Sequence, residues 1–78
     1  MNLATQSQDA RTAAIAQCRN LESRCIAIGS ETGADMARGW ADNLTAESWM
    51  PASFYRWWLA DLTRFVERRE AQTERAAA

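Results

Sequence analysis

The sequence contains no histidine and no lysine, and these absences remove much of the chemistry on which enzymes depend. Histidine is the commonest general base, and lysine supplies Schiff bases and the phosphate loop of nucleotide-binding proteins. Two carboxylates could still act as a glycosidase-like pair, but every acid lies on an expected polar helix face or connector. We therefore expect a protein that is not an enzyme and that uses no cofactor.

Cysteine is scarce, and the two that are present suit neither a disulfide nor a metal site. Cys18 and Cys25 lie in one expected helix, where seven residues separate their Cα atoms by ~10.5 Å. A disulfide needs less than ~7 Å, and a closed zinc site needs two further ligands. We expect no metal and small apolar roles for both residues, with a site shared by two copies of the chain as the alternative.

Positive charge is not in excess, because nine arginines face ten acidic residues and the net charge is −1. Nucleic-acid-binding proteins normally carry clustered positive charge, so a nucleic-acid partner is disfavoured. An abundance of alanine without lysine or histidine is typical of a GC-rich bacterial, phage or plasmid gene.

Long apolar runs are also missing. Crossing a bilayer takes ~20 apolar residues, and the opening segment MNLATQSQDA lacks the basic and apolar regions of a signal peptide. These features predict a cytoplasmic protein without a membrane segment.

Three glycines and one proline interrupt a chain that otherwise follows a helical period. Gly29 suits the left-handed position that ends a helix, Pro51 suits a first helical turn, and Gly39 could admit a close neighbour. Short connections between amphipathic helices predict an all-α fold, a small antiparallel three-helix bundle that dimerises. We expect one domain over residues 1–78, with helices at about 9–28, 32–44 and 51–72 and a frayed tail at 73–78.

Each expected helix has an apolar face. The first helix carries a narrow stripe of small and aliphatic residues at spacings of four and three. Two interpretations of this stripe are open: packing against the third helix inside one chain, and the seam of a homodimer. Dimerisation is expected because a core of this size rarely supplies more than ~3–5 kcal/mol. The seam consists of Ala14, Cys18, Leu21, Cys25 and Ile28, flanked by Ile15 and Ile26. The second helix presents Met36, Ala37, Trp40 and Leu44, and the third Phe54, Tyr55, Trp58, Leu59, Leu62, Phe65 and Val66.

One tryptophan stands outside these faces. Trp57 lies roughly 130° from the centre of the third helix's apolar face, among polar and charged neighbours. Tryptophan and arginine are enriched at interaction hot spots, so we predict a partner-binding surface here. The alternatives are that another helix covers Trp57, or that its exposure beside Trp58 has no function. The predicted surface consists of Trp57, Asp61, Arg64, Arg68 and Trp49.

The segment ASFYRWWLADL opens with a small-x-Tyr-Arg-Trp pattern that resembles the recognition helix of helix-turn-helix proteins. This resemblance implies a DNA-binding transcriptional regulator as the alternative function. The linker before the segment is longer than the usual tight turn, and the charge balance does not suit DNA. We therefore expect a protein-interaction module, an adaptor or stoichiometric inhibitor of a protein partner. Its composition favours a phage- or plasmid-encoded protein that acts on host machinery.

Overall fold

The computed structural model describes residues 3–46 and 51–77, with side chains from residue 9 onward. This part of the chain contains three helices and no strand. They are α1 (Leu3–Ala27), α2 (Glu31–Ala46) and α3 (Ala52–Ala77). The protein is therefore all-α, as the sequence predicts.

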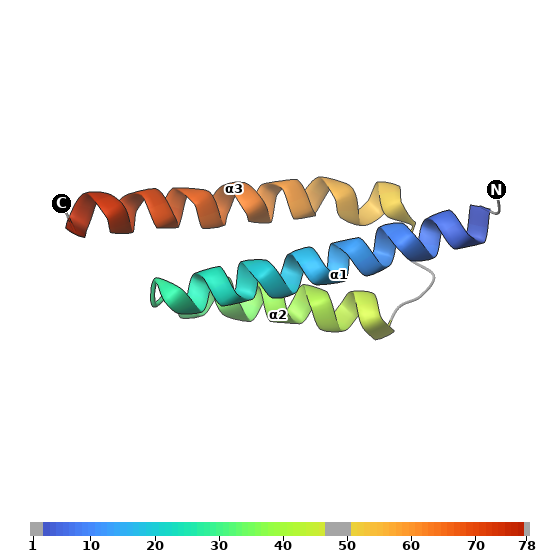
Figure 1. The fold of residues 1–78 in the computed structure, drawn as a ribbon, viewed down its shortest axis with the longest axis horizontal. Helices are drawn as coiled ribbons and strands as arrows, with labels where there is room; N and C mark the ends of the chain where they lie inside the picture. Colours follow the sequence, from blue (N-terminus) through green and yellow to red (C-terminus); the bar gives the residue numbers. More distant parts are fainter. Residues whose placement is uncertain (1–2, 47–50, 78) are drawn as a thin grey trace.

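The helices lie along one long axis, with α1 in the middle (Figure 1). The chain reverses after α1, so α2 runs in the opposite direction, and α3 returns on the other side of α1 in the direction of α1 (Figure 1). Both α2 and α3 pack against α1, but they approach each other much less closely. The result is an elongated molecule with principal extents of 50 × 20 × 15 Å.

Two helices are longer than the sequence analysis indicates. The first begins at Leu3 instead of near residue 9, because the segment LATQSQ has no proline or glycine and is rich in good helix formers. The third helix continues to Ala77, so residues 73–77 are helical. The expectation that this segment is a frayed tail is therefore wrong. Its alanines, glutamates and arginines have high helix propensity, and the hydroxyl of Thr73 donates to the carbonyl of Arg69 at 3.0 Å.

The turn between α1 and α2 is built by Gly29, whose φ of 74° lies in the left-handed region. The amide of Gly29 donates to the carbonyl of Ile26 at 3.1 Å, and that of Ser30 donates to Cys25 at 2.8 Å. This pair of hydrogen bonds is the Schellman arrangement that satisfies the last carbonyls of a helix. The predicted end of the first helix at Gly29 is confirmed.

The start of each following helix is also capped. The side-chain oxygen of Ser30 accepts from the amide of Gly33 at 3.4 Å, as expected of an N-cap serine. The carbonyl of Pro51 accepts from the amide of Phe54 at 2.9 Å, which places the proline one residue before the first helical residue of α3.

The core runs along the inner side of α1 and includes residues from all three helices. In α1 the buried positions recur at spacings of four and three, as in the stripe read from the sequence. The buried apolar residues are Ala14, Cys18, Leu21, Cys25, Ala34, Ala37, Ala41, Leu44, Tyr55, Trp58, Leu59, Leu62 and Val66.

Gly33, and not Gly39, is the glycine at which a neighbour comes close. A Cβ atom added to Gly33 would lie 2.6 Å from Sγ of Cys25 and 3.3 Å from Cε1 of Phe65. A Cβ added to Gly39 would meet nothing within 4 Å. The expectation for Gly39 is therefore wrong, and the missing side chain of Gly33 is what lets α2 lie against α1.

Polar contacts join α1 to its neighbours on the outside. Arg19 pairs with Asp42 at 3.0 Å, and Arg38 pairs with Glu22 at 2.6 Å, which ties α1 to α2. On the other side of α1, the guanidinium of Arg24 donates to both carboxylate oxygens of Glu70 in α3, at 3.0 and 2.5 Å. The hydrogen bond from Arg24 is also the main cause that lowers the pKa of Glu70.

Three apolar residues that the sequence places on inner faces are exposed instead. Phe54 exposes 51% of its surface, Ile26 61% and Met36 38%. Each lies at the edge of its helix's apolar face, and with only three helices no further element covers that edge. The assignment of Phe54 to the core of the third helix is therefore wrong.

Candidate interaction surface

The side of α3 that faces away from α1 carries an exposed stripe with spacings of three and four residues. Trp57, at 72% exposed, is the most exposed large apolar side chain of the described residues. We call this set the outer stripe of α3. It consists of Phe54, Trp57, Asp61, Arg64 and Arg68.

The charges of the outer stripe are only partly paired. The guanidinium of Arg64 forms an ion pair with Asp61 one turn before it. Within residues 9–46 and 51–77, neither Arg68 nor Arg69 takes part in an ion pair. Arg69 instead lies over the ring of Phe65, with its Cζ 5.2 Å from the ring centroid. The C-terminal half of the stripe therefore offers positive charge beside an aromatic ring.

Beside the outer stripe, the loose approach of α2 to α3 leaves a groove with a volume of about 410 Å³. Its apolar lining comes from both helices, and its charged side comes from α3 alone. We call it the α2–α3 groove. It is lined by Met36, Trp40, Trp58, Asp61, Leu62, Arg64, Phe65 and Arg68.

Two stacked tryptophans join the helices across this groove. The rings of Trp40 and Trp58 lie 3.8 Å apart between centroids, with an interplanar angle of 17°. The indole nitrogen of Trp58 is buried, and it has no hydrogen-bond partner among the residues that the structure describes. An unpaired buried donor costs ~1–3 kcal/mol, so this contact is held by stacking and apolar burial rather than by hydrogen bonding.

The structure brings most of the predicted partner-binding residues together. Trp57, Asp61, Arg64 and Arg68 share one exposed side of α3, and the last three also line the α2–α3 groove. Trp49 lies outside the described residues. The sequence reading missed Phe54 as a member of the stripe, although its position three residues before Trp57 is a signal that could have revealed it.

Most residues of the predicted dimer seam lie in the core of a single chain and not on its surface. Ala14, Cys18, Leu21 and Cys25 are at most 4% exposed inside a single chain, and Ile28 is half-buried beside the α1–α2 turn. Of the two interpretations that the sequence leaves open, packing inside one chain therefore describes these residues in the structure. A second copy could reach them only if α2 or α3 moved away, so the seam is corrected to core.

Both cysteines are buried thiols without a disulfide. Burial raises the pKa of Cys18 from 9.0 to about 11, against a smaller opposite effect of Arg19. Burial also raises the pKa of Cys25, and the carboxylate of Glu70 adds to the rise. Since the thiolate is the reactive form, neither cysteine is set up as a nucleophile.

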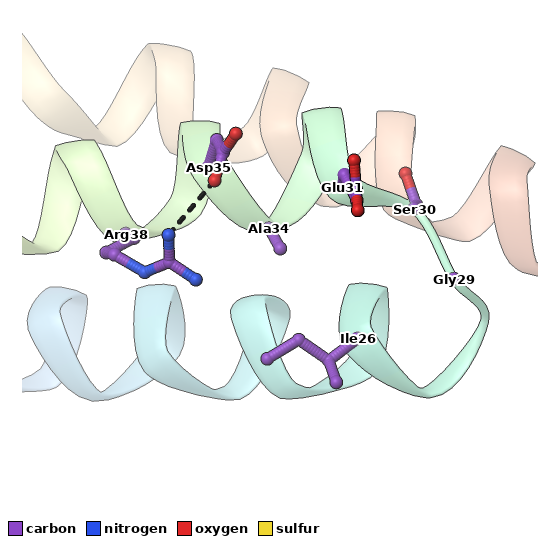
Figure 2. A pocket seen from close by; sticks show the side chains of 7 residues that line it. All are labelled: Ile26, Gly29, Ser30, Glu31, Ala34, Asp35 and Arg38. Carbon is purple, nitrogen blue, oxygen red and sulfur yellow. Dashed lines mark hydrogen bonds and ion pairs between the residues drawn. The ribbon is translucent and has the colours of Figure 1, made fainter.

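A second hollow, of about 570 Å³, lies at the turn between α1 and α2. Figure 2 shows Ile26 on the α1 side and the ion pair of Arg38 with Asp35 on the α2 side, joined at 3.0 Å. Arg38 also donates a hydrogen bond to Glu22, and this bond raises the pKa of Arg38. Arg38 and Asp35 neutralise each other here, and the hydroxyl oxygen of Ser30 accepts from the amide of Gly33, so these polar side chains of the lining are engaged in local structure.

The described residues lack two further features. No cluster of three or more histidine, cysteine or acidic side chains is placed to hold a metal ion there. None of α1, α2 and α3 is both long and apolar enough to cross a membrane.

Comparison with protein-family models, curated protein sequences and solved structures finds no match for this chain. The functional interpretation therefore depends on the geometry of the outer stripe and the adjoining groove.

Proposed function

We propose that this protein is a small, non-enzymatic protein-interaction module that acts as an adaptor or a stoichiometric inhibitor of a protein partner. The observation that carries the proposal is the exposure of Trp57, at 72%, within a stripe that also contains two arginines. Burying an indole of this kind at an interface can contribute ~2 kcal/mol or more.

The α2–α3 groove supports the same proposal. It places apolar side chains from two helices beside a wall of charged residues from α3. Grooves of this composition suit an amphipathic helix, whose apolar face enters the groove while its polar flanks meet the rim. Arg64 and Arg68 could bind carboxylates of such a helix in a bidentate manner.

Several finer properties belong to the proposal. The three helices form an antiparallel bundle that is stable in solution and associates with a second copy. The protein acts in the cytoplasm, and a phage or plasmid origin fits its alanine-rich, lysine-free composition. Interference with host machinery follows by analogy with other small regulators of this build.

DNA binding receives less support than protein binding. In helix-turn-helix proteins two helices cross at ~90–120°, whereas α2 and α3 lie along one axis (Figure 1). Tyr55 of the pattern and the adjacent Trp58 of the same segment are buried in the core, whereas Trp57 of the pattern is exposed. We therefore place the protein partner first.

The proposal predicts that a double substitution, Trp57→Ala with Arg64→Glu, abolishes partner binding without unfolding the protein. Both side chains are exposed, so the helical circular-dichroism signal and the melting temperature should stay nearly unchanged. Loss of the indole alone should weaken binding by ~30-fold or more, because ~1.4 kcal/mol corresponds to a factor of ten. Affinity capture from cells of the native host, followed by calorimetry with the captured protein, measures the effect.

Arg56→Glu provides the matched control, since Arg56 is an exposed arginine of α3 outside the outer stripe. The control should bind as the parent does. A double variant that folds and still binds would place the active surface elsewhere, and one that unfolds would show that Trp57 is structural.

A further inference from the structure

The outer stripe of α3 is complementary to itself when two copies meet in opposite directions. Trp57 and Arg68 are equally far in sequence from the midpoint between Leu62 and Thr63, and so are Asp61 and Arg64. A two-fold axis at this midpoint would therefore bring Trp57 of one copy to Arg68 of the other, and Asp61 of one copy to Arg64 of the other.

We propose that the occupant of the outer stripe is a second copy of this chain, with the two α3 helices packed antiparallel about that axis. The inference rests on the proposed function, because it names the partner of the same surface. It replaces α1 with α3 as the dimer contact, since the stripe of α1 is buried in the core of one chain.

Helix geometry permits this pairing. At 1.5 Å and ~100° per residue, Trp57, Asp61, Arg64 and Arg68 fall within an arc of ~60° on α3. Trp57 and Arg68 lie ~8 Å along the axis on either side of the midpoint, and the other two lie ~2 Å from it. The four side chains therefore share one face at heights that the two-fold axis exchanges in pairs.

Charge complementarity favours this arrangement over a parallel one. Within one chain, Asp61 already pairs with Arg64. In the antiparallel dimer, each of these side chains also meets the opposite charge of the second copy, which creates an alternating network of charges. Such networks contribute more than isolated surface pairs. A parallel pairing in register would place Asp61 against the same carboxylate of the second copy.

The aromatic contacts lie at the two ends of this network. Trp57 of the second copy arrives at the level of Arg68, where Arg64, Phe65 and Arg68 line the α2–α3 groove. Arg68 has no ion pair among the described residues, so its guanidinium is available to stack on the indole. The same contact repeats at the other end by symmetry.

The size of the contact predicts a weak and reversible dimer. Two large aromatics in each copy, Trp57 and Phe54, bury at most ~300–500 Å². A standard interface buries ~800 Å² per partner. We therefore expect an equilibrium between monomer and dimer at micromolar concentrations.

Sedimentation equilibrium of charge variants tests the proposal. Asp61→Arg gives each copy positive charge at both central positions, and Arg64→Asp gives each copy negative charge there. Each variant alone should sediment as a monomer at concentrations at which the parent is a dimer. An equimolar mixture of the two should form a heterodimer, because unlike charges then meet across the axis. Trp57→Ala should weaken the parent dimer at least ~10-fold.

Arg56→Asp is the matched control for Arg64→Asp, since it makes the same change of charge in α3 at a position outside the outer stripe. This control should dimerise as the parent does. Melting curves of all variants separate loss of association from loss of the fold.

Two results would overturn the second-copy inference: a parent protein that stays monomeric throughout the micromolar range, or a dimer that both charge variants retain. A monomeric parent that binds another protein through Trp57 overturns the inference but leaves the proposed function standing. A parent dimer that shows the full charge pattern, but binds no other protein through Trp57, supports the inference while the proposed adaptor function fails.

Discussion

Neighbouring residues of the same type have opposite positions in this protein: Trp57 is 72% exposed, whereas Trp58 is 8% exposed. One helical step of ~100° separates them, and it turns Trp58 onto the stack with Trp40 while Trp57 points to the outside of the bundle. The same step explains why the charged members of the outer stripe, Asp61, Arg64 and Arg68, accompany Trp57 rather than Trp58. The composition of the outer stripe therefore follows from the angular positions of these residues around the axis of α3.

Cys18 gives a residue-scale prediction about alkaline pH. Burial raises its pKa from 9.0 to about 11 in the folded protein, so the unfolded chain loses the thiol proton first as the pH rises. The contribution of this thiol to stability should therefore be complete below pH 9 and should be lost between about pH 9 and 11. Urea unfolding at several pH values, compared between the parent and Cys18→Ala, measures this contribution.

A free energy of unfolding that changes in parallel for the parent and Cys18→Ala across this range would contradict the burial of the thiol. Alkylation gives an independent check. Cys18 should react with iodoacetamide only under conditions that unfold the chain, because the buried thiol is both protonated and shielded.

At the scale of elements, the closest packing is between α1 and α2. The Schellman turn at Gly29 reverses the chain, and the absence of a side chain at Gly33 lets the two helices approach at Cys25. The ion pairs of Arg19 and Arg38 then join their outer surfaces. On the other side of α1, the ion pair of Arg24 with Glu70 joins α3 to α1.

Two alanine substitutions in α2 should have opposite effects on stability. Gly33→Ala places a methyl group 2.6 Å from Sγ of Cys25, so we expect an overpacking cost of ~1–3 kcal/mol. Gly39→Ala meets nothing within 4 Å, and it should stabilise the helix by up to ~1 kcal/mol. Thermal unfolding of the two variants measures the difference, and equal melting temperatures would show that α2 does not approach α1 at Gly33.

The two glycines also show which features of the elements are predictable. Gly29 ends α1 through a local backbone requirement, so the sequence alone indicates it. The helical period distinguishes Gly33 from Gly39, because Gly33 lies four and seven residues before Ala37 and Trp40 on the apolar face, whereas Gly39 lies on the side of Asp35 and Asp42. How close the neighbour comes to Gly33 depends on how the helices pack. The extra turns lie at the start of α1 and at the end of α3. The apolar period does not reveal them, because residues of high helix propensity extend the helix beyond its apolar face.

At the scale of the whole molecule, the arrangement of α2 and α3 around α1 decides which surface remains available. Because α1 lies in the middle, its apolar stripe is covered on both sides. The loose approach of α2 to α3 leaves the groove between them, and the outer stripe of α3 lies beside it. The outer stripe of α3 thus combines exposed aromatics with Arg68, which has no ion pair among the described residues.

The sequence predicts the exposure of Trp57 because the phase of a long amphipathic helix can be read directly from its apolar positions. It does not predict the groove, since the space between α2 and α3 depends on helix separations. It also misplaces Phe54, because the edge of an apolar face is buried or exposed according to how many helices surround it. Ala14, Cys18, Leu21 and Cys25 illustrate the same limit, since an apolar stripe can face either its own chain or a second one.

Hydroxyl-radical footprinting of the dissociated and the associated protein tests the central claim that the outer stripe of α3 is the binding surface. In dilute, dissociated protein, Trp57 and Ile26 are both exposed and should both be oxidised rapidly. On association, with a second copy or another protein, Trp57 should become protected while Ile26, at the α1–α2 hollow, keeps its rate. Protection of Ile26 with an unchanged rate at Trp57 would contradict the account and assign binding to the other side of the molecule.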